Sequence, residues 1–83
     1  MNYSKPTPEQ IENNQDNLEQ INSYIESIEK YEGMIVRTEN NGKLQDHIKR
    51  DNISDFKNMM FQKQKEIKRL KAMVQDYNEY FSN

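Results

Sequence analysis

The chain of 83 residues has no cysteine and one histidine, His47. Disulfide frameworks and thiolate metal sites are therefore excluded, and a histidine cluster cannot form. His47 and Asp51 are four residues apart and could supply two metal ligands, which are too few for a site, so we interpret His47 as a surface residue. Glycine-rich phosphate loops and nucleophile–base pairs are also lacking. These absences predict a protein that is not an enzyme and has no catalytic residues, metal, cofactor or small-molecule substrate.

Long hydrophobic runs are also lacking. The longest apolar runs, for example 34–36 and 59–61, have three residues, whereas a membrane span needs about 20 and a signal peptide about 7 to 15. We therefore expect no membrane span and a cytoplasmic location, meaning the host cytoplasm or the virion if the protein is viral. The small size and the richness in Asn, Gln, Lys and Ile are typical of an accessory protein of an AT-rich genome, such as a phage or mobile element.

Apolar residues make up 33 % of the chain and charged residues 31 %, with a mean hydropathy of -1.26. Such a balance is typical of long exposed helices or of disorder. A chain of this length buries only roughly 60 % of the surface that its unfolded form exposes. A large private core is therefore excluded.

Proline and glycine are scarce, and both prolines lie within the first ten residues. Thr7 is a suitable N-cap, and Pro8 suits the first turn of a helix. The next residues are compatible with a helix to about residue 38. Its apolar residues recur at intervals of seven, three, four and three, with Asn14 at the polar position between the first two: Ile11, Leu18, Ile21, Ile25 and Ile28. This spacing predicts a heptad seam.

The second half repeats the pattern over about residues 43–81, at alternating intervals of three and four. Its seam positions are Ile53, Phe56, Met60, Lys63, Ile67, Leu70, Val74, Tyr77 and Phe81. Between the halves, the sequence Asn40-Asn41-Gly42 tolerates the left-handed conformation of a chain reversal. We therefore predict an all-α, coiled-coil-like antiparallel helical hairpin. Residues 1–7 would be an N-terminal extension, and residues 8–83 a single domain with its turn at about 39–42.

In an antiparallel pair, the residue numbers of facing layers add to a constant. A constant of 81 centres the turn between Asn40 and Asn41. The predicted layers are Ile28 with Ile53, Ile25 with Phe56, Ile21 with Met60, Leu18 with Lys63, Asn14 with Ile67, and Ile11 with Leu70. At the flanks, this register places Tyr24 beside Met59 and Glu29 beside Arg50, and nearer the tip it places Glu32 opposite Lys49 in an a/d layer. At the open end it places Val74 opposite Thr7 and Tyr77 opposite Ser4.

The periodicity fails around the tip of the predicted hairpin, at Met34, Val36, Leu44 and Ile48. One interpretation is a kink or break in the second arm near residues 50–54, with Asn52 or Ser54 as a new helix cap. Another is a small β-hairpin, because residues 35–38 followed by Asn41-Gly42 are compatible with a strand and a type I′ turn. We rank the continuous or kinked helix first and the β-hairpin second.

Charge is unevenly distributed along the chain. Residues 1–42 carry three basic and eight acidic side chains, a net charge of -5, whereas residues 43–83 carry nine and six, a net charge of +3. The two halves would attract each other in a hairpin, or could attract external partners. Six of the basic side chains cluster within fifteen residues: Lys57, Lys63, Lys65, Lys68, Arg69 and Lys71. They are interpreted first as a solvated helix face, and alternatively as a contact surface for nucleic acid.

A lone pair of helices would leave apolar side chains uncovered. The residues that we expect at a protein interface are Tyr24, Tyr31, Met59, Phe61, Met73, Val74, Tyr77 and Phe81. We expect them to close a homodimeric four-helix bundle or to dock on another protein. The sequence thus predicts a protein-interaction module, acting as an adaptor, inhibitor or structural subunit, with a nucleic-acid-binding helical dimer as the alternative.

Overall fold

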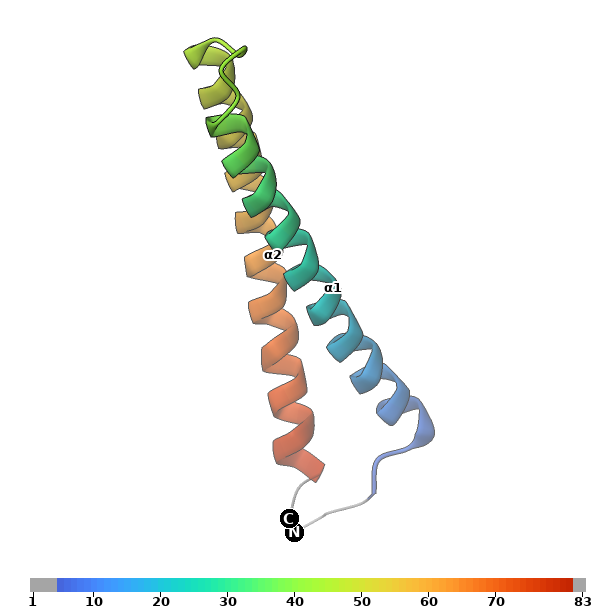
Figure 1. Ribbon diagram of the computed structural model, residues 1–83. Helices are drawn as coiled ribbons and strands as arrows, with labels where there is room; N and C mark the ends of the chain where they lie inside the picture. Colours follow the sequence, from blue (N-terminus) through green and yellow to red (C-terminus); the bar gives the residue numbers. More distant parts are fainter. Residues whose placement is uncertain (1–4, 82–83) are drawn as a thin grey trace.

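The computed structural model describes residues 5–81, and they form two long helices side by side in a hairpin (Figure 1). The first helix, α1, spans Pro8–Glu39, and the second, α2, spans Asp46–Phe81. No strand occurs between residues 5 and 81. The molecule measures 63 × 17 × 16 Å with a radius of gyration of 18.7 Å, against about 12 Å for a compact domain of this length. The predicted all-α hairpin is confirmed, and its shape is that of a rod.

The start of α1 is held by a reciprocal pair of hydrogen bonds between Thr7 and Gln10. The Gln10 backbone N–H donates to Thr7 Oγ1 over 3.1 Å, and the Thr7 backbone N–H donates to Gln10 Oε1 over 2.8 Å. This capping box satisfies backbone donors that have no acceptor within the helix. Pro8 occupies the first turn, where its missing N–H is not needed. The predicted Thr7 cap is confirmed. Of the expected N-terminal extension, residues 5–7 are described.

Residues 40–45 reverse the chain between the two helices. The Lys43 backbone N–H donates to Asn41 Oδ1 over 2.9 Å, and the Leu44 N–H donates to the Asn41 carbonyl over 3.2 Å. This turn is built on the asparagine side chain. No residue from 5 to 81 has a positive φ, so the left-handed conformation predicted for Asn40-Asn41-Gly42 does not occur. As a result α2 begins at Asp46, three residues later than expected.

Both sides of the loop are helical. Residues 35–38, the strand of the second-ranked interpretation, lie inside α1, so the predicted β-hairpin is wrong. Helix α2 continues through residues 50–54 without interruption, so the break predicted there, with a cap at Asn52 or Ser54, is also wrong. The physical reason is that the loop at 40–45 already supplies the single departure from helix that the reversal needs. Lys49 Nζ reinforces it by donating to the Glu39 carbonyl at the end of α1 over 3.2 Å.

Two side-chain contacts define the register of the helices. The ring centroids of Tyr31 and Phe56 are 6.1 Å apart, and Lys63 Nζ lies 5.1 Å from the centroid of the Tyr24 ring. The residue numbers of both pairs add to 87, so the predicted constant of 81 is wrong. Phe56 therefore faces Tyr31, and the predicted layer with Ile25 is replaced. The longer loop causes this change, because it moves the centre of the hairpin three residues toward α2.

A shift of six residues also rotates the contact face of α1. Successive helical residues are about 100° apart around the helix axis. A register shift of seven residues would therefore keep nearly the same face of α1 toward α2, whereas a shift of six brings a different face toward it. The tyrosine side of α1 therefore turns toward α2, and the side carrying Leu18 and Ile25 turns away. Two of the five apolar residues in the predicted seam of α1, Ile21 and Ile28, still pack against α2.

The core is small and lies near the middle of the rod. Ile21, Ile67 and Leu70 are 7, 9 and 4 % exposed and are the buried residues between positions 5 and 81. Tyr24, Ile28 and Val74 are partly buried and pack against them. The layers predicted for Ile21 with Met60 and for Ile11 with Leu70 are therefore wrong. In the observed register Ile21 belongs to the same layer as Ile67, which shifts the core toward the chain termini.

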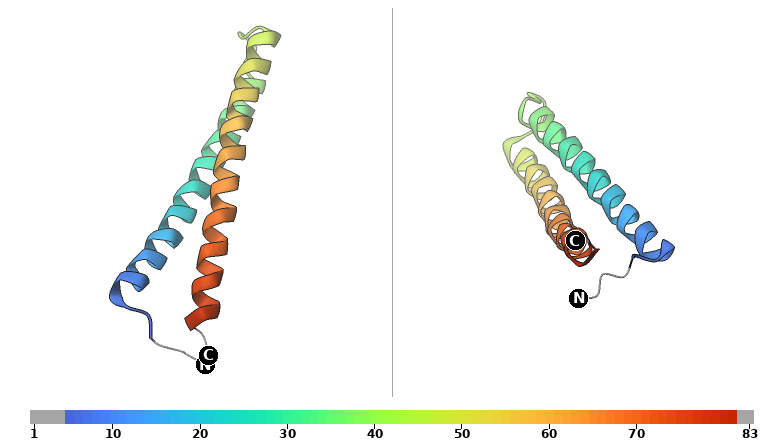
Figure 2. Two further views of the ribbon diagram at one scale, coloured as in Figure 1. Left: turned by 180° about the vertical axis from the view of Figure 1, so that it is seen from behind. Right: turned by 90° about the horizontal axis from the view of Figure 1, so that it is seen from below.

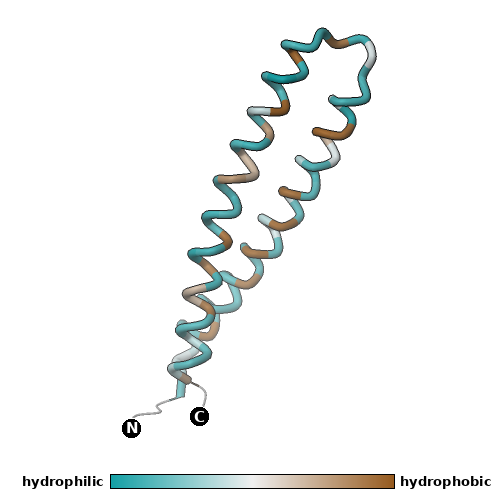
Figure 3. The backbone as a smooth tube through the Cα atoms, turned by 90° about the vertical axis from the view of Figure 1, so that its left-hand side faces the viewer, coloured by the Kyte–Doolittle hydropathy of each residue, from teal (hydrophilic) through white to brown (hydrophobic). Residues whose placement is uncertain are grey.

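The helices lie close together near the loop and diverge toward the termini (Figures 1 and 2). Figure 3 shows apolar residues recurring along both helices, separated by polar stretches. On the inner side of α1 near the open end, Asn14 and Asn17 occupy heptad positions, and Asn14 Oδ1 is buried without a hydrogen-bond partner. Polar side chains offer little apolar surface to close against, whereas Tyr77 and Phe81 on α2 are bulky. These residue types explain the divergence.

Candidate protein-interaction surfaces

A groove of about 220 Å³ lies on one flank of the hairpin, between the two helices. It is lined by Tyr24, Tyr31, Met59, Gln62, Lys63 and Glu66, and we call it the tyrosine groove. Three residues that were predicted at an interface thus lie at one surface, and Tyr24 shares the groove with Met59 as expected. The two tyrosines reach it because the register turns their side of α1 toward α2. Their rings are half-buried, and Met59 is exposed.

The other flank of α1 carries an aliphatic column that α2 leaves uncovered. Ile11, Leu18 and Ile25 recur every seven residues and are 51, 37 and 38 % exposed. Because Tyr24 and Tyr31 lie on the tyrosine-groove side of the core, helix geometry places this column on the opposite side. Its residues were predicted to face α2, and the structure places them at the surface. We call them the aliphatic column.

The origin of the column is visible in the sequence of α1, which contains two overlapping heptad frames. Both frames share Asn14, Ile21 and Ile28; one is completed by Ile11, Leu18 and Ile25, and the other by Asn17, Tyr24 and Tyr31. Aliphatic residues favour the first frame, and α2 packs against the second. The regular spacing of the two tyrosines was the signal that could have revealed the second frame. One helix thus offers two faces, and α2 covers one of them.

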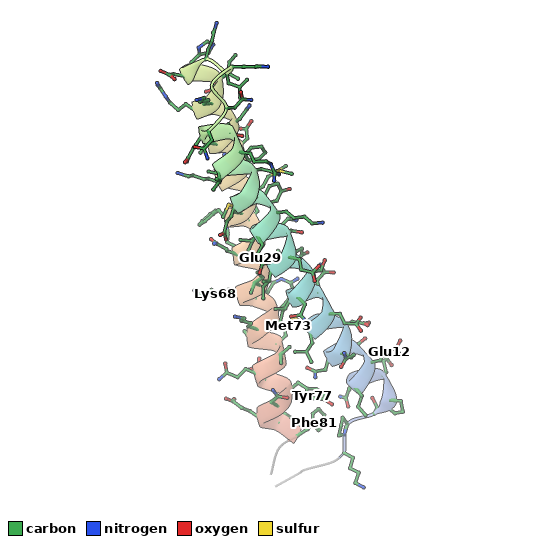
Figure 4. The ribbon with its side chains drawn as sticks, in the orientation of Figure 1. Glu12, Glu29, Lys68, Met73, Tyr77 and Phe81 are labelled. Atoms are coloured by element: carbon green, nitrogen blue, oxygen red, sulfur yellow. The ribbon has the colours of Figure 1, made fainter. Side chains whose placement is uncertain are left out.

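Phe61 and Met73, also predicted at an interface, lie outside the lining of the tyrosine groove. Phe61 is exposed, with Lys65 Nζ 5.3 Å from its ring centroid, a distance typical of a cation–π contact. Met73 is exposed on α2 (Figure 4), and its sulfur accepts a contact from Arg69 Nη1 at 3.5 Å. These two side chains are single exposed residues, each covered in part by a neighbouring cation.

The remaining predicted interface residues lie toward the open end of the hairpin. Tyr77 and Phe81 project from α2 on the side that faces α1 (Figure 4), with ring centroids 4.9 Å apart. Together with Pro6 and Asn78 they line a hollow. Val74 packs against the buried core instead of facing only Thr7. Ser4, the predicted counterpart of Tyr77, lies outside the described residues.

The six basic side chains of the predicted cluster do not form one face. Lys63 lies over the Tyr24 ring, Lys65 lies over Phe61, and Arg69 forms two hydrogen bonds of 3.2 Å with the Glu66 carboxylate. These hydrogen bonds, aided by the opposite charges, lower the pKa of Glu66 and raise the pKa of Arg69. The other three cations, Lys57, Lys68 and Lys71, share the outer side of α2, and Figure 4 shows Lys68 pointing away from α1.

The charge asymmetry is not neutralised within the hairpin. Helix α1 carries eight acidic and two basic residues, a net charge of -6, whereas α2 carries six and eight, a net charge of +2. The ion pair found between residues 5 and 81 is Glu66 with Arg69, inside α2. The predicted pairs of Glu29 with Arg50 and Glu32 with Lys49 are therefore wrong. In the observed register Arg50 falls level with Arg37, which has the same charge.

Comparison of the chain with protein families, characterised proteins and solved structures finds no match. Within the described range 5–81, acidic and histidine side chains do not assemble in groups of three or more that could hold a metal ion. In the same range neither helix is long and apolar enough to cross a bilayer. The tyrosine groove, the aliphatic column and the unpaired charges are thus the features from which a function can be argued.

Proposed function

We propose that this chain is a non-catalytic protein-interaction module, which serves as an adaptor, an inhibitor or a structural subunit. Its free faces are closed by another protein or by a second copy in a four-helix bundle. The observation that carries the proposal is the amount of surface left open. The accessible surface is 6561 Å², compared with about 5200 Å² for a compact monomer of 10.0 kDa.

The kind of surface left open supports the same proposal. Scattered apolar side chains are normal on monomers, but contiguous patches mark interaction sites. Here the aliphatic column repeats an exposed aliphatic side chain in three successive heptads, and the tyrosine groove combines tyrosine and methionine, which are enriched at protein interfaces. The polar groove residues Gln62, Lys63 and Glu66 can make hydrogen bonds with a partner. A helix with an apolar side chain directed into the groove fits this arrangement.

The proposal is tested by co-purification of partners from cells that express the tagged chain. We expect the variant Tyr24→Ser, Met59→Gln to lose a bound protein that the unsubstituted chain retains, because both changes remove apolar surface from the groove. Phe61→Ser is the matched control, since Phe61 is exposed outside the groove. Circular dichroism of each variant verifies that the helices persist. A chain that neither retains a protein nor self-associates would contradict the proposal.

A second candidate, a nucleic-acid-binding helical dimer, is favoured by one observation. Lys57, Lys68 and Lys71 share the outer side of α2, and the described residues pair none of them with an acid. Three phosphate contacts would give a log–log salt dependence of about -2.7 on duplex DNA. We expect Lys57→Glu with Lys68→Glu to abolish such binding and Arg69→Glu, the matched control, to weaken it less. Absence of binding at low salt would eliminate this candidate.

A further inference from the structure

The flank that carries the aliphatic column also has apolar residues on α2. Ile53, Met60 and Ile67 recur every seven residues on the side of α2 away from the tyrosine groove; Ile53 and Met60 are half-buried, and Ile67 belongs to the buried core. Ile53 borders a surface hollow with Arg50 and Lys57, and Ile67 borders another with Lys68 and Lys71. The column and these residues are therefore the two apolar halves of one flank, with acidic side chains beyond the α1 half and basic side chains beyond the α2 half.

We propose that a second copy of this chain packs on this flank, with the loops of both copies at the same end of the assembly. The inference rests on the proposed function and names its partner. The two copies would be related by a two-fold axis parallel to the helices, so that α1 of each copy lies beside α2 of the other. Leu18 and Ile25 then enter the centre of a four-helix bundle beside the half-buried Met60 of both copies, adjacent to Ile67, which each hairpin already buries.

Charge decides the relative direction of the copies. With the loops together, the helix of net charge -6 lies beside the helix of net charge +2, and every neighbouring pair is antiparallel. With the loops at opposite ends, α1 would lie beside α1 and place the two most acidic surfaces in contact. Like charges brought together at an interface cost several kcal/mol. The arrangement with the loops together is therefore favoured, because it brings the acidic helix of each copy beside the basic helix of the other.

Specific pairs follow from the register. Residues of α1 and α2 that face each other within a hairpin have numbers that add to about 87. With both loops at the same end of the assembly, a residue of α1 lies level with the residue of α2 in the second copy that satisfies the same sum. Glu19 then lies level with Lys68 of the second copy, and Glu29 lies level with Lys57. Within the hairpin, none of these four side chains forms an ion pair with a residue between 5 and 81. Each dimer would contain two copies of each pair.

The area required is present. The hairpin exposes roughly 1300 Å² more than a compact monomer of its mass. A stable interface of standard size covers about 800 Å² on each partner. An interface on one flank would therefore cover only part of the extra exposed area. The tyrosine groove on the other flank would remain free to bind a different protein.

The first experiment is sedimentation equilibrium with charge reversal. We expect a dimer at micromolar concentration, and on the order of 100-fold weaker self-association for Glu19→Lys with Glu29→Lys or for Lys57→Glu with Lys68→Glu. An equimolar mixture of the two variants should recover a dimer, because each reversed surface then meets its opposite. Failure of the mixture to associate would overturn the charge pairing, and helicity by circular dichroism identifies a variant that has not folded.

An uncharged variant provides an independent route. Leu18→Gln should weaken the dimer, whereas the matched change Met73→Gln, at an exposed site on the other side of α2, should not. An unsubstituted chain that stays monomeric at millimolar concentration would overturn the inference of a second copy. A monomeric chain would not by itself contradict the proposed function, because the co-purification experiment tests protein binding at the tyrosine groove on the other flank.

The direction of the copies is tested by a distance between loops. The chain has no cysteine, and a Cβ added at Gly42 meets no atom within 4 Å, so a Gly42→Cys variant accepts a single spin label without disturbing the loop. We expect a label separation of roughly 10 to 30 Å, the width of a bundle whose helices are 8 to 10 Å apart. A separation close to the 63 Å length of the molecule would overturn the proposed arrangement.

Discussion

The ring of Tyr31 in α1 packs against the ring of Phe56 in α2, with centroids 6.1 Å apart and an angle of 32° between the planes. The contact joins residues on either side of the loop, so it can form only in one alignment of the helices. Together with Lys63 over Tyr24, it establishes the register that turns Leu18 and Ile25 outward.

The aromatic contact should be measurable as an energetic coupling. In a double-mutant cycle of Tyr31→Ala and Phe56→Ala, we expect a coupling of about 0.5 to 1.5 kcal/mol in the free energy of unfolding. Ile25→Ala replaces Tyr31→Ala in the control cycle, which should give no coupling, since Ile25 faces away from Phe56. Chemical denaturation supplies the four free energies of each cycle. A coupling found with Ile25 and absent with Tyr31 would restore the register with a constant of 81.

Two leucines allow the same substitution to be compared inside and outside the core. Leu70→Ala should lower the free energy of unfolding by about 2 to 5 kcal/mol, because Leu70 is the most buried residue in the described part of the chain. Leu18→Ala should cost about 1 kcal/mol or less, because its side chain keeps contact with solvent. Both are measured by denaturation at concentrations where the chain is monomeric. Equal losses would show that the aliphatic column is buried in the monomer.

The capping box predicts a local effect at the start of α1. Thr7→Ala removes the oxygen that accepts from the Gln10 N–H and should cost about 1 kcal/mol. Thr7→Ser keeps that oxygen and should be close to the unsubstituted protein. Amide hydrogen exchange provides the measurement, with faster exchange expected in the first turn of α1 and unchanged exchange near the loop. Unchanged protection of Gln10 in Thr7→Ala would show that the cap is dispensable.

The pair of Glu66 and Arg69 predicts a pH effect of known sign. Hydrogen bonds from Arg69 and its charge lower the pKa of the Glu66 carboxyl in the folded chain. The pair therefore stabilises the folded chain above the ordinary carboxyl pKa, and this contribution is lost as the pH falls through the lowered value. Both side chains are about half exposed, so the effect on stability should be small.

The titration of Glu66 itself is the sharper measurement. Followed by the NMR signal of its side-chain carboxyl carbon, the titration midpoint should lie below the ordinary value and should rise toward it in Arg69→Gln. Lys68→Gln is the matched control, because it removes a neighbouring positive charge and leaves both hydrogen bonds in place. If the two variants shift the midpoint equally, general charge and not the hydrogen-bonded pair is responsible.

Local features of the chain were predictable because they depend on neighbours in sequence. The Thr7 cap needs only Gln10 three residues later and Pro8 between them. The heptad intervals of α2 from Ile53 to Phe81 likewise identified its inner face, since no second apolar frame competes with it. The inward position of Ile67 and Leu70 was therefore predicted correctly, although their partners on α1 were not.

The interaction surfaces were predictable in part. Tyr24, Tyr31 and Met59 were selected as surplus apolar residues, and the structure places all three at one groove. The aliphatic column was not predicted as a surface, because isoleucine and leucine are preferred over tyrosine and asparagine when a seam is chosen from composition.

The sequence by itself determined that this protein is a pair of long amphipathic helices joined near residue 42, because capping, periodicity and helix-compatible residues act over a few positions. The tertiary structure alone decided which face of α1 meets α2. Two heptad frames overlap in α1, and the choice between them depends on how many loop residues separate the helices. A turn built on the Asn41 side chain lengthens that loop. The resulting register shift of six residues turns the tyrosine face of α1 toward α2 and leaves the face with Leu18 and Ile25 exposed.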